Sequence, residues 1–153
     1  MRVLVIDDEP DVLLLCRVNL EFSGHEVLQA SDADQGIELA IGGAPDLIVL
    51  DVMLPSRDGL SVLRELASHP ATEGTPVVLL TARTRRTDRL QGWEAGCAGY
   101  VTKPFAPMDL TETIEHVHSM SRVDRRLHRE AMLTELRRRA VAPAPGEPSE
   151  PTR

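Results

Sequence analysis

The hydrophobic residues of the chain gather in short runs, and longer segments with helical spacing separate these runs. Residues 3–6, 47–50 and 77–80 consist only of Val, Ile and Leu, without polar alternation. Uninterrupted runs of this kind are typical of strands buried on both faces, as in a parallel sheet covered by helices. A weaker run at residues 100–101 predicts a further strand, and the alternating segment 26–30 predicts a strand near an edge of the sheet.

Amphipathic segments with recognisable helix ends lie between the runs. Pro10 suits the first turn of a helix, either Ser31 or Asp32 can cap a second, and Asp58 can cap a third. The predicted helices cover residues 11–22, 33–41, 60–67 and 84–95, and a fifth begins at Met108 or Asp109. Strand and helix therefore alternate five times. This order predicts an α/β fold, a three-layer, doubly wound, five-stranded parallel sheet with right-handed crossovers.

The composition changes after Ser121, where helix-forming residues and then prolines dominate. We expect a main domain at residues 1–120, a helical extension at 121–140 that continues the helix before it, and a disordered, proline-rich tail at 141–153. One face of the extension carries four arginines, which are Arg122, Arg125, Arg126 and Arg129. We interpret this face as solvated charge, and contact with nucleic acid is the alternative.

Charge and cysteine content exclude several classes of protein. The chain has 17 basic and 24 acidic side chains, and the excess of acids lies in the main domain, which argues against sequence-independent nucleic-acid binding there. No apolar run approaches the ~20 residues of a membrane-spanning helix, and the N-terminus does not resemble a secretory signal. Cys16 and Cys97 are too few for a disulfide framework, so we expect reduced thiols in a cytoplasmic protein.

Polar side chains follow the ends of the predicted strands. In chain order they are Asp7, Asp8, Glu9, Asp51, Thr81 and Lys103, the last of which is the only lysine. Because the carboxyl ends of parallel strands meet at one edge of a sheet, we expect these side chains to lie together. Crowded carboxylates stay ionised only with a cation among them, and oxygen ligands favour Mg²⁺. A carboxylate held by Mg²⁺ and an ammonium group can accept a phosphoryl group.

A single aspartate at a strand end is more often a turn former or a helix cap than a catalytic group. That interpretation does not explain why all of these polar residues fall at strand ends. Together with their flanking residues they resemble the receiver domain of bacterial two-component response regulators, over about residues 2–120. The motifs that carry the resemblance are the acidic pair within residues 5–10, Asp51 within 50–55 with Asp58-Gly59 behind it, Thr81-Ala82, and residues 100–105 with Lys103-Pro104.

The resemblance implies a flavodoxin-like receiver fold and a role for each acid. Asp51 would be the phosphoacceptor. Asp8 would bind Mg²⁺ directly, together with Asp51 and the backbone carbonyl of Met53. Asp7 would add charge and a water-mediated contact to the same ion.

The resemblance also implies a switch. Thr81 would hydrogen-bond the phosphoryl group, and Lys103 would form an ion pair with it. The Lys103-Pro104 peptide would be cis. Tyr100 would turn inward when Thr81 moves toward the phosphoryl group. The response would be a shift between two conformations that changes the surface of the fourth helix, the fifth strand and the fifth helix.

The implied partners are those of a signalling domain that does not turn over substrate. The donor would be a sensor histidine kinase, a phosphotransfer protein or a small molecule such as acetyl phosphate, and the output would be contact with a downstream protein. A phosphorylation-dependent homodimer is an alternative, although Ala98-Gly99 stands where dimerising relatives usually have acids. We expect no membrane contact and no nucleic-acid contact by this chain.

Two alternative functions remain open from the sequence. In the first, the chain is the receiver of a larger regulator whose DNA-binding or enzymatic effector lies beyond residue 153. In the second, it is a Mg²⁺-dependent phosphatase with Asp51 as nucleophile, but Met53 stands where such enzymes usually place a second acid.

The predicted fourth helix carries two further candidate features. Arg83, Arg85, Arg86 and Arg89 form a basic cluster at its start. We interpret this cluster as solvated charge, with a docking surface as the alternative. Trp93, the only tryptophan, has helical spacing to Leu90, and we interpret it as a packing residue rather than a contact anchor.

Overall fold

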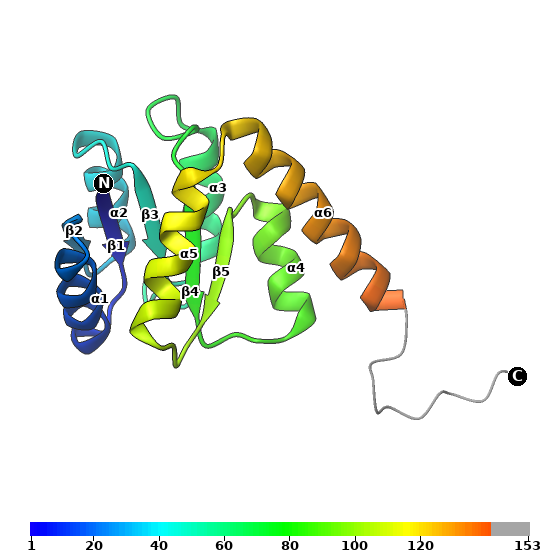
Figure 1. Ribbon diagram of the computed structural model, residues 1–153, viewed down its shortest axis with the longest axis horizontal. Helices are drawn as coiled ribbons and strands as arrows, with labels where there is room; N and C mark the ends of the chain where they lie inside the picture. The colour runs from blue at the N-terminus through cyan, green and yellow to red at the C-terminus, as the bar shows by residue number, and fades with distance from the viewer. Residues whose placement is uncertain (142–153) are drawn as a thin grey trace, which may run out of the picture.

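Five parallel strands form one sheet in a computed structural model that describes residues 1–141 (Figure 1). The strands are β1 (Arg2–Ile6), β2 (Glu26–Ala30), β3 (Leu47–Leu50), β4 (Val77–Thr81) and β5 (Gly99–Thr102), and their spatial order is β2-β1-β3-β4-β5. All five predicted strands are confirmed, and the alternating segment at Glu26–Ala30 lies at an edge as expected. The predicted tail lies outside the described residues from residue 142 onward.

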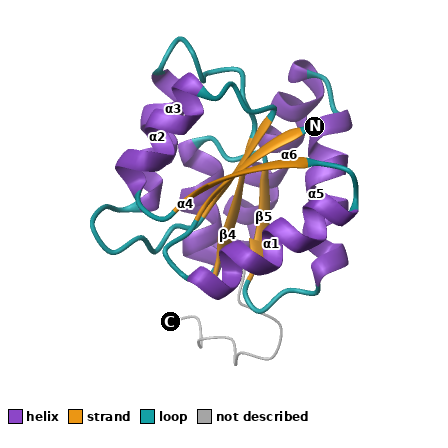
Figure 2. Cartoon of the chain, turned by 90° about the vertical axis from the view of Figure 1, so that its left-hand side faces the viewer, coloured by secondary structure: helices purple, strands orange, loops and turns teal. Residues whose placement is uncertain are grey.

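Helices cover both faces of the sheet (Figure 2). They are α1 (Pro10–Phe22), α2 (Ala33–Gly42), α3 (Gly59–Ser68), α4 (Arg86–Ala95) and α5 (Pro107–Ser119). Side chains of α1 and α5 pack on one face, and side chains of α2, α3 and α4 pack on the other. The three-layer α/β fold is therefore confirmed. The fourth helix begins two residues later than predicted, since residues 82–85 form a loop after β4.

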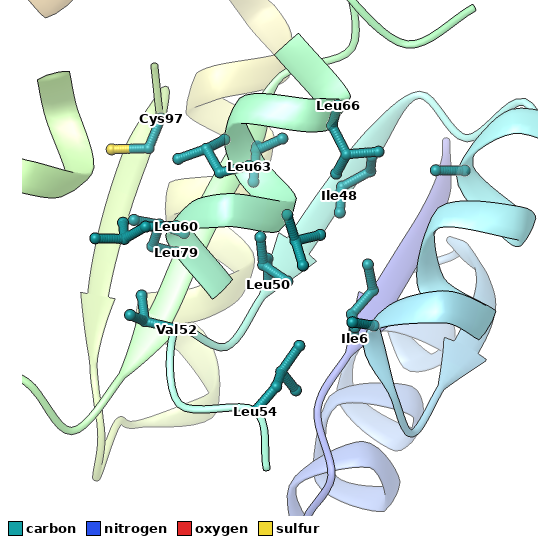
Figure 3. Packing of buried hydrophobic residues seen from close by; sticks show 14 of the residues in the cluster. Ile6, Ile48, Leu50, Val52, Leu54, Leu60, Leu63, Leu66, Leu79 and Cys97 are labelled. Carbon is teal, nitrogen blue, oxygen red and sulfur yellow. The ribbon is translucent and has the colours of Figure 1, made fainter. Parts of the chain in front are cut away.

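The central strands are apolar at every position because both of their faces are covered. In β1, Leu4 and Ile6 point into the α2–α3–α4 side of the core, whereas Val3 and Val5 point to the α1–α5 side, and all four are fully buried. Figure 3 shows the first of these two clusters, with Ile6 beside α2 and side chains of β3 and α3 across the cluster. This burial on both faces explains the uninterrupted apolar runs.

Local signals set the ends of several helices. Asp32, rather than Ser31, caps α2 by accepting a hydrogen bond of 2.8 Å from the backbone N–H of Gln35. Asp58 caps α3 in the same way, through Leu60 at 3.1 Å. Gly96 ends α4 with a left-handed φ of 108°, a conformation that glycine adopts at low cost. Within residues 1–141, no helix combines the length and hydrophobicity needed to cross a bilayer.

The helical extension is present as α6 (Arg122–Val141), but the prediction that it continues the fifth helix is wrong. Helix α5 ends at Met120, whose backbone is extended at φ −76° and ψ 139°. Ser121 Oγ then accepts from the N–H of Asp124 at 3.0 Å, and the Asp124 carboxylate accepts from the N–H of Ser121 at 3.4 Å. This reciprocal pair is a capping box, which starts a new helix. As a result, α6 turns back along α4 (Figure 1).

The solvated-face interpretation of the extension is wrong for part of its arginines. Arg129 is half-buried, and its Nε donates to the carbonyl of Trp93 at 2.7 Å. Arg125 is also half-buried and donates to the carbonyl of Met120 at 2.8 Å, whereas Arg122 and Arg126 are exposed. The extension is therefore attached to the domain through some of the same arginines that make its surface basic.

Gly59 allows the loop after β3 to pass close to the start of α3, and its replacement tests this packing. A Cβ at residue 59 would lie 2.5 Å from the backbone oxygen of Asp51 and from the Cα of Val52. We expect Gly59→Ala to destabilise the chain by about 1–3 kcal/mol, the usual cost of forcing extra volume into packed structure. Denaturant unfolding would measure the change.

The matched control is Gly42→Ala, since a Cβ at residue 42 meets nothing within 4 Å. Because alanine is the better helix former, this variant should be neutral or up to about 1 kcal/mol more stable. Equal stability of Gly59→Ala and the wild type would contradict the packing argument.

Candidate functional site

Three aspartates meet at the carboxyl end of the sheet. Asp7 follows β1 and Asp51 follows β3, and these two strands are neighbours with Ile6 opposite Leu50. One carboxylate oxygen from each of Asp7, Asp8 and Asp51 lies within 4.8 Å of the other two. Asp7 and Asp51 are buried, and Asp8 is the more accessible member of the group. The predicted convergence of acids is thus present in the structure.

The ammonium group of Lys103 reaches these acids from the loop after β5, the strand at one edge of the sheet. Its Nζ lies 2.9 Å from Asp51 Oδ2, 2.7 Å from Asp7 Oδ2 and 3.2 Å from Glu9 Oε1. The Lys103 side chain is only 12% exposed, and its backbone N–H donates to the carbonyl of Thr81 at 2.9 Å. The following peptide to Pro104 is cis, as the resemblance implied. The loop after β5 is therefore bonded to the end of β4 and to the acids that follow β1 and β3.

Burial and charge act in opposite directions on these groups. Burial raises the pKa of Asp7 above its ordinary value, and the ionised Asp51 raises it further, against hydrogen bonds from Lys103 and from the N–H of Glu9. For Lys103, burial works to lower the pKa, but the hydrogen bonds and charges of Asp7 and Asp51 outweigh it and the pKa is raised. Lys103 thus stays protonated, while the ionised form of Asp7 is held at a cost.

The donor set fits a hard divalent cation. Asp51 Oδ1 is held by the N–H of Met53 at 2.9 Å, and Asp7 Oδ1 by the N–H of Glu9 at 2.9 Å. Asp7 Oδ2 is buried and, among the described residues, has no hydrogen-bond partner beyond its ion pair with Lys103. Carboxylate oxygens at this density are ligands that Mg²⁺ accepts. The side chain of Met53 is half-exposed beside the acids.

Thr81 and Tyr100 are linked through one backbone residue. Thr81 is fully buried at the end of β4, and its Oγ1 accepts from the N–H of Arg83 at 3.2 Å. The hydroxyl of half-buried Tyr100 donates to the carbonyl of the same Arg83 at 2.7 Å. The guanidinium of Arg89 lies 5.5 Å from the centre of the Tyr100 ring. Movement of the loop after β4 would therefore act on Thr81 and Tyr100 together.

Two contacts at the site were missed in the sequence. Glu9 was counted among the acids but not as a partner of Lys103, and its place two residues after Asp7 was the available signal. The backbone of Arg83 connects Thr81 to Tyr100, and no side-chain pattern reports a backbone contact of this kind. The predicted site residues are otherwise brought to one end of the sheet.

A buried carboxylate with fixed oxygens can act as a nucleophile. Lys103 and the N–H of Met53 each hold one oxygen of Asp51, so its orientation is set before any reaction. A cation between the acids would reduce their mutual repulsion and the charge on an incoming anionic group. The arrangement suits transfer of an anionic group to Asp51.

Comparison with known proteins supplies independent findings. The family model of the response regulator receiver domain matches residues 3–115. The chain is 39% identical over 135 residues to the DNA-binding dual master transcriptional regulator RpaA of Synechocystis sp., covering 88% of this chain and 55% of that protein. It spans about half the length of the curated relatives it matches.

Solved structures agree with the fold. The chemotaxis response regulator CheY4 of Vibrio cholerae superposes with a TM-score of 0.72 at 28% identity, covering 76% of this chain and 97% of that chain. The BeF3-activated N-terminal receiver domain of Klebsiella pneumoniae RstA superposes with a TM-score of 0.72 at 27% identity, covering 78% of this chain and all of that one.

Asp7 provides a test of the site's electrostatics. Because the folded chain raises its pKa, ionised Asp7 reduces the free energy of unfolding as pH rises from the unfolded pKa of about 3.9 through the higher folded value. We expect Asp7→Asn to be more stable than wild type at pH 7 without divalent cations, on the order of 1 kcal/mol. The difference in the free energy of unfolding between Asp7→Asn and wild type should become smaller as the pH falls through the folded pKa of Asp7.

Urea unfolding at pH 7 and in acid, with a chelator present, measures this difference. Asp34→Asn is the control, because Asp34 is exposed in the first turn of α2 and away from the cluster. A destabilised Asp7→Asn variant at pH 7 would mean that the ion pair with Lys103 outweighs burial.

Proposed function

The chain belongs to the family of response regulator receiver domains, and we propose that Asp51 is the residue that accepts a phosphoryl group. The observation that carries this proposal is the geometry of Asp51, which is buried, held at both oxygens and adjacent to two further acids. Receiver domains are signalling domains, so the transferred group serves as a signal rather than an intermediate of turnover.

The three acids would hold Mg²⁺ during the transfer. Asp8 and Asp51 would be direct ligands with the backbone carbonyl of Met53, and Asp7 would contribute charge and a contact through water. The close approach of the three carboxylates, two of them buried, supports this assignment. When bound, Mg²⁺ would neutralise charge on the phosphoryl oxygens.

The transfer itself needs one nucleophile and one leaving group. A carboxylate oxygen of Asp51 attacks the donor phosphorus, the bond to the donor breaks, and an aspartyl phosphate forms. Lys103 already contacts Asp51 at 2.9 Å and would move its hydrogen bond to a phosphoryl oxygen. Thr81 would turn its hydroxyl from the N–H of Arg83 to the same group, which draws the loop after β4 toward the site.

The donor would be a sensor histidine kinase, a phosphotransfer protein or acetyl phosphate. The surface of α1 supports a protein donor, because Leu14, Val18 and Phe22 are exposed at helical spacing and begin one turn after the acids. Their exposed fractions are 51%, 55% and 93%, and exposed apolar stripes of this kind mark contact surfaces. A location in the cytoplasm is part of this proposal, and the low cysteine content supports it.

We propose that the responding surface passes the signal on by contact with another protein or with a further region of a larger regulator. Relatives are named as transcriptional regulators, and the chain covers about half of their length. These findings support the alternative in which this receiver works within a larger regulator. The surface that responds would be α4, β5 and α5, because the Thr81–Arg83–Tyr100 contacts lead there.

The acceptor assignment predicts a complete loss of labelling in Asp51→Asn. The amide is a poor nucleophile, so incubation with acetyl phosphate and Mg²⁺ should add one phosphoryl group to wild type and none to the variant. Intact-mass measurement detects the addition. Asp34→Asn, at an exposed helix position, should label as wild type does, and persistent labelling of Asp51→Asn would assign the acceptor elsewhere.

The role of Lys103 predicts that labelling and response separate in Lys103→Ala. Without the ammonium group, Asp51 can still attack, but the phosphoryl group loses a contact that holds the new arrangement. We expect labelled Lys103→Ala to lose the shifts of β5 and α4 amide resonances that labelled wild type shows. NMR spectra with and without Mg²⁺ and acetyl phosphate measure this, and wild-type shifts in the variant would refute the role.

A further inference from the structure

The helices α4 and α6 hold each other at both ends. At the end of α4, Arg129 donates to the carbonyls of Trp93 at 2.7 Å and Glu94 at 3.1 Å. At the opposite end, Arg86 of α4 donates to the carbonyl of Arg139 in the last turn of α6. Each arginine therefore lies at the negative end of the partner helix dipole, where a cation is stabilising. The two helices run antiparallel.

Apolar contacts fill the space between these polar ends. Trp93 is 3% exposed, and its ring meets the ring of His128 edge to face at 5.5 Å between centres. Leu133 and Leu136 of α6 are buried in the same core cluster as Trp93. Leu127, on the outer side of α6, is 54% exposed. The inner face of α6 is thus a specific packing surface.

This packing covers part of the surface proposed to respond to phosphorylation. A cavity of about 190 Å³ lies between α4, β5, α5 and α6, and Tyr100 and Trp93 line it together with His128 and Met132 of α6. Figure 1 shows α6 lying along α4 on the side away from α1. Tyr100 and residues of α6 therefore line the same cavity.

The loop after β4 connects the acids to this cavity. Arg83 binds Thr81 through its N–H and Tyr100 through its carbonyl, and Arg86, three residues later, holds the end of α6. A shift of this loop toward Asp51 would move the start of α4 relative to the sheet. The contacts of α6 fit the arrangement in which Thr81 binds Arg83 rather than a phosphoryl group.

We propose that α6 is an intramolecular partner of the α4–β5 surface and that loading of Asp51 releases it. The inference rests on the proposed function, since it requires the site to accept a phosphoryl group or its mimic. While α6 is docked, neither a second copy nor another helix can pack on Trp93. Because coupling is reciprocal, undocking α6 also favours the loaded state of Asp51.

Trp93 gives a direct readout in the full chain because it is the only tryptophan. We would measure its emission wavelength and its quenching by acrylamide, with and without Mg²⁺ and beryllofluoride, while fluorine NMR reports bound beryllofluoride. Release of α6 should shift the emission to longer wavelength and increase quenching. With beryllofluoride, the Trp93 emission and quenching of wild type should approach those of Leu133→Asp. This variant places a charge in the α4–α6 contact and should release α6 by itself.

The matched control is Leu127→Asp, the same change on the exposed side of the same helix. It should leave Trp93 emission unchanged without beryllofluoride and respond to beryllofluoride as wild type does. Leu133→Asp should show the emission and quenching of the released state before beryllofluoride is added and change little when it is added. It should also bind beryllofluoride more tightly than Leu127→Asp does.

The outcomes separate the two proposals. Bound beryllofluoride with unchanged Trp93 quenching in wild type would overturn the release of α6 and leave the acceptor assignment intact. Equal affinities of Leu133→Asp and Leu127→Asp for beryllofluoride would overturn the reciprocal coupling, which relates binding free energies. A chain that binds no beryllofluoride and gains no phosphoryl group would overturn both proposals.

Discussion

The carboxyl end of the sheet depends on one ammonium group held among buried carboxylates. Lys103 contacts Asp51 at 2.9 Å and Asp7 at 2.7 Å, and it is attached to β4 through the carbonyl of Thr81. Without a cation at this position, two buried carboxylates would face each other on adjacent strands. Removing one partner of a buried ion pair leaves an uncompensated charge, which is strongly destabilising. The loop after β5 therefore stays over β1 and β3 although its strand is at the edge.

The same constraint prepares the site to change state. Burial and repulsion raise the pKa of Asp7, so the acids hold more negative charge than one lysine balances well. Under the proposed function, a divalent cation would relieve this imbalance, and an incoming anionic group would give Lys103 and Thr81 a new partner. Either event would move a side chain that is bonded to a neighbouring loop. A change at the acids would therefore also shift the backbone of that loop, because packed interiors transmit displacement.

The sequence predicts the central part of the molecule well because its signals are local or periodic. Runs such as Leu47–Leu50 identify buried parallel strands, and the parallel order alone brings Asp7 and Asp51 to one edge. The course of the helical extension was predicted wrongly, as a continuation of α5. Leu127 and Leu133 are equally apolar, and which of them is buried depends on where α6 starts and which helix it meets. The capping box at Ser121 was a readable signal for the break, whereas the docking on α4 is a tertiary outcome.

The packing around Gly92 supports the proposal that α4 transmits a change. A Cβ at residue 92 would lie 2.8 Å from Leu79 and 3.3 Å from the Tyr100 ring, so α4 approaches the sheet more closely than a larger residue would allow. At this position α4 lies against the Tyr100 ring, and Trp93, the next residue, contacts His128 of α6. The basic residues at the start of α4 are then not only solvated charge, since Arg86 binds α6 and Arg89 lies over Tyr100. A face already engaged by its own helix is a poor site for a constitutive dimer, and this favours an output that begins with the freeing of α4.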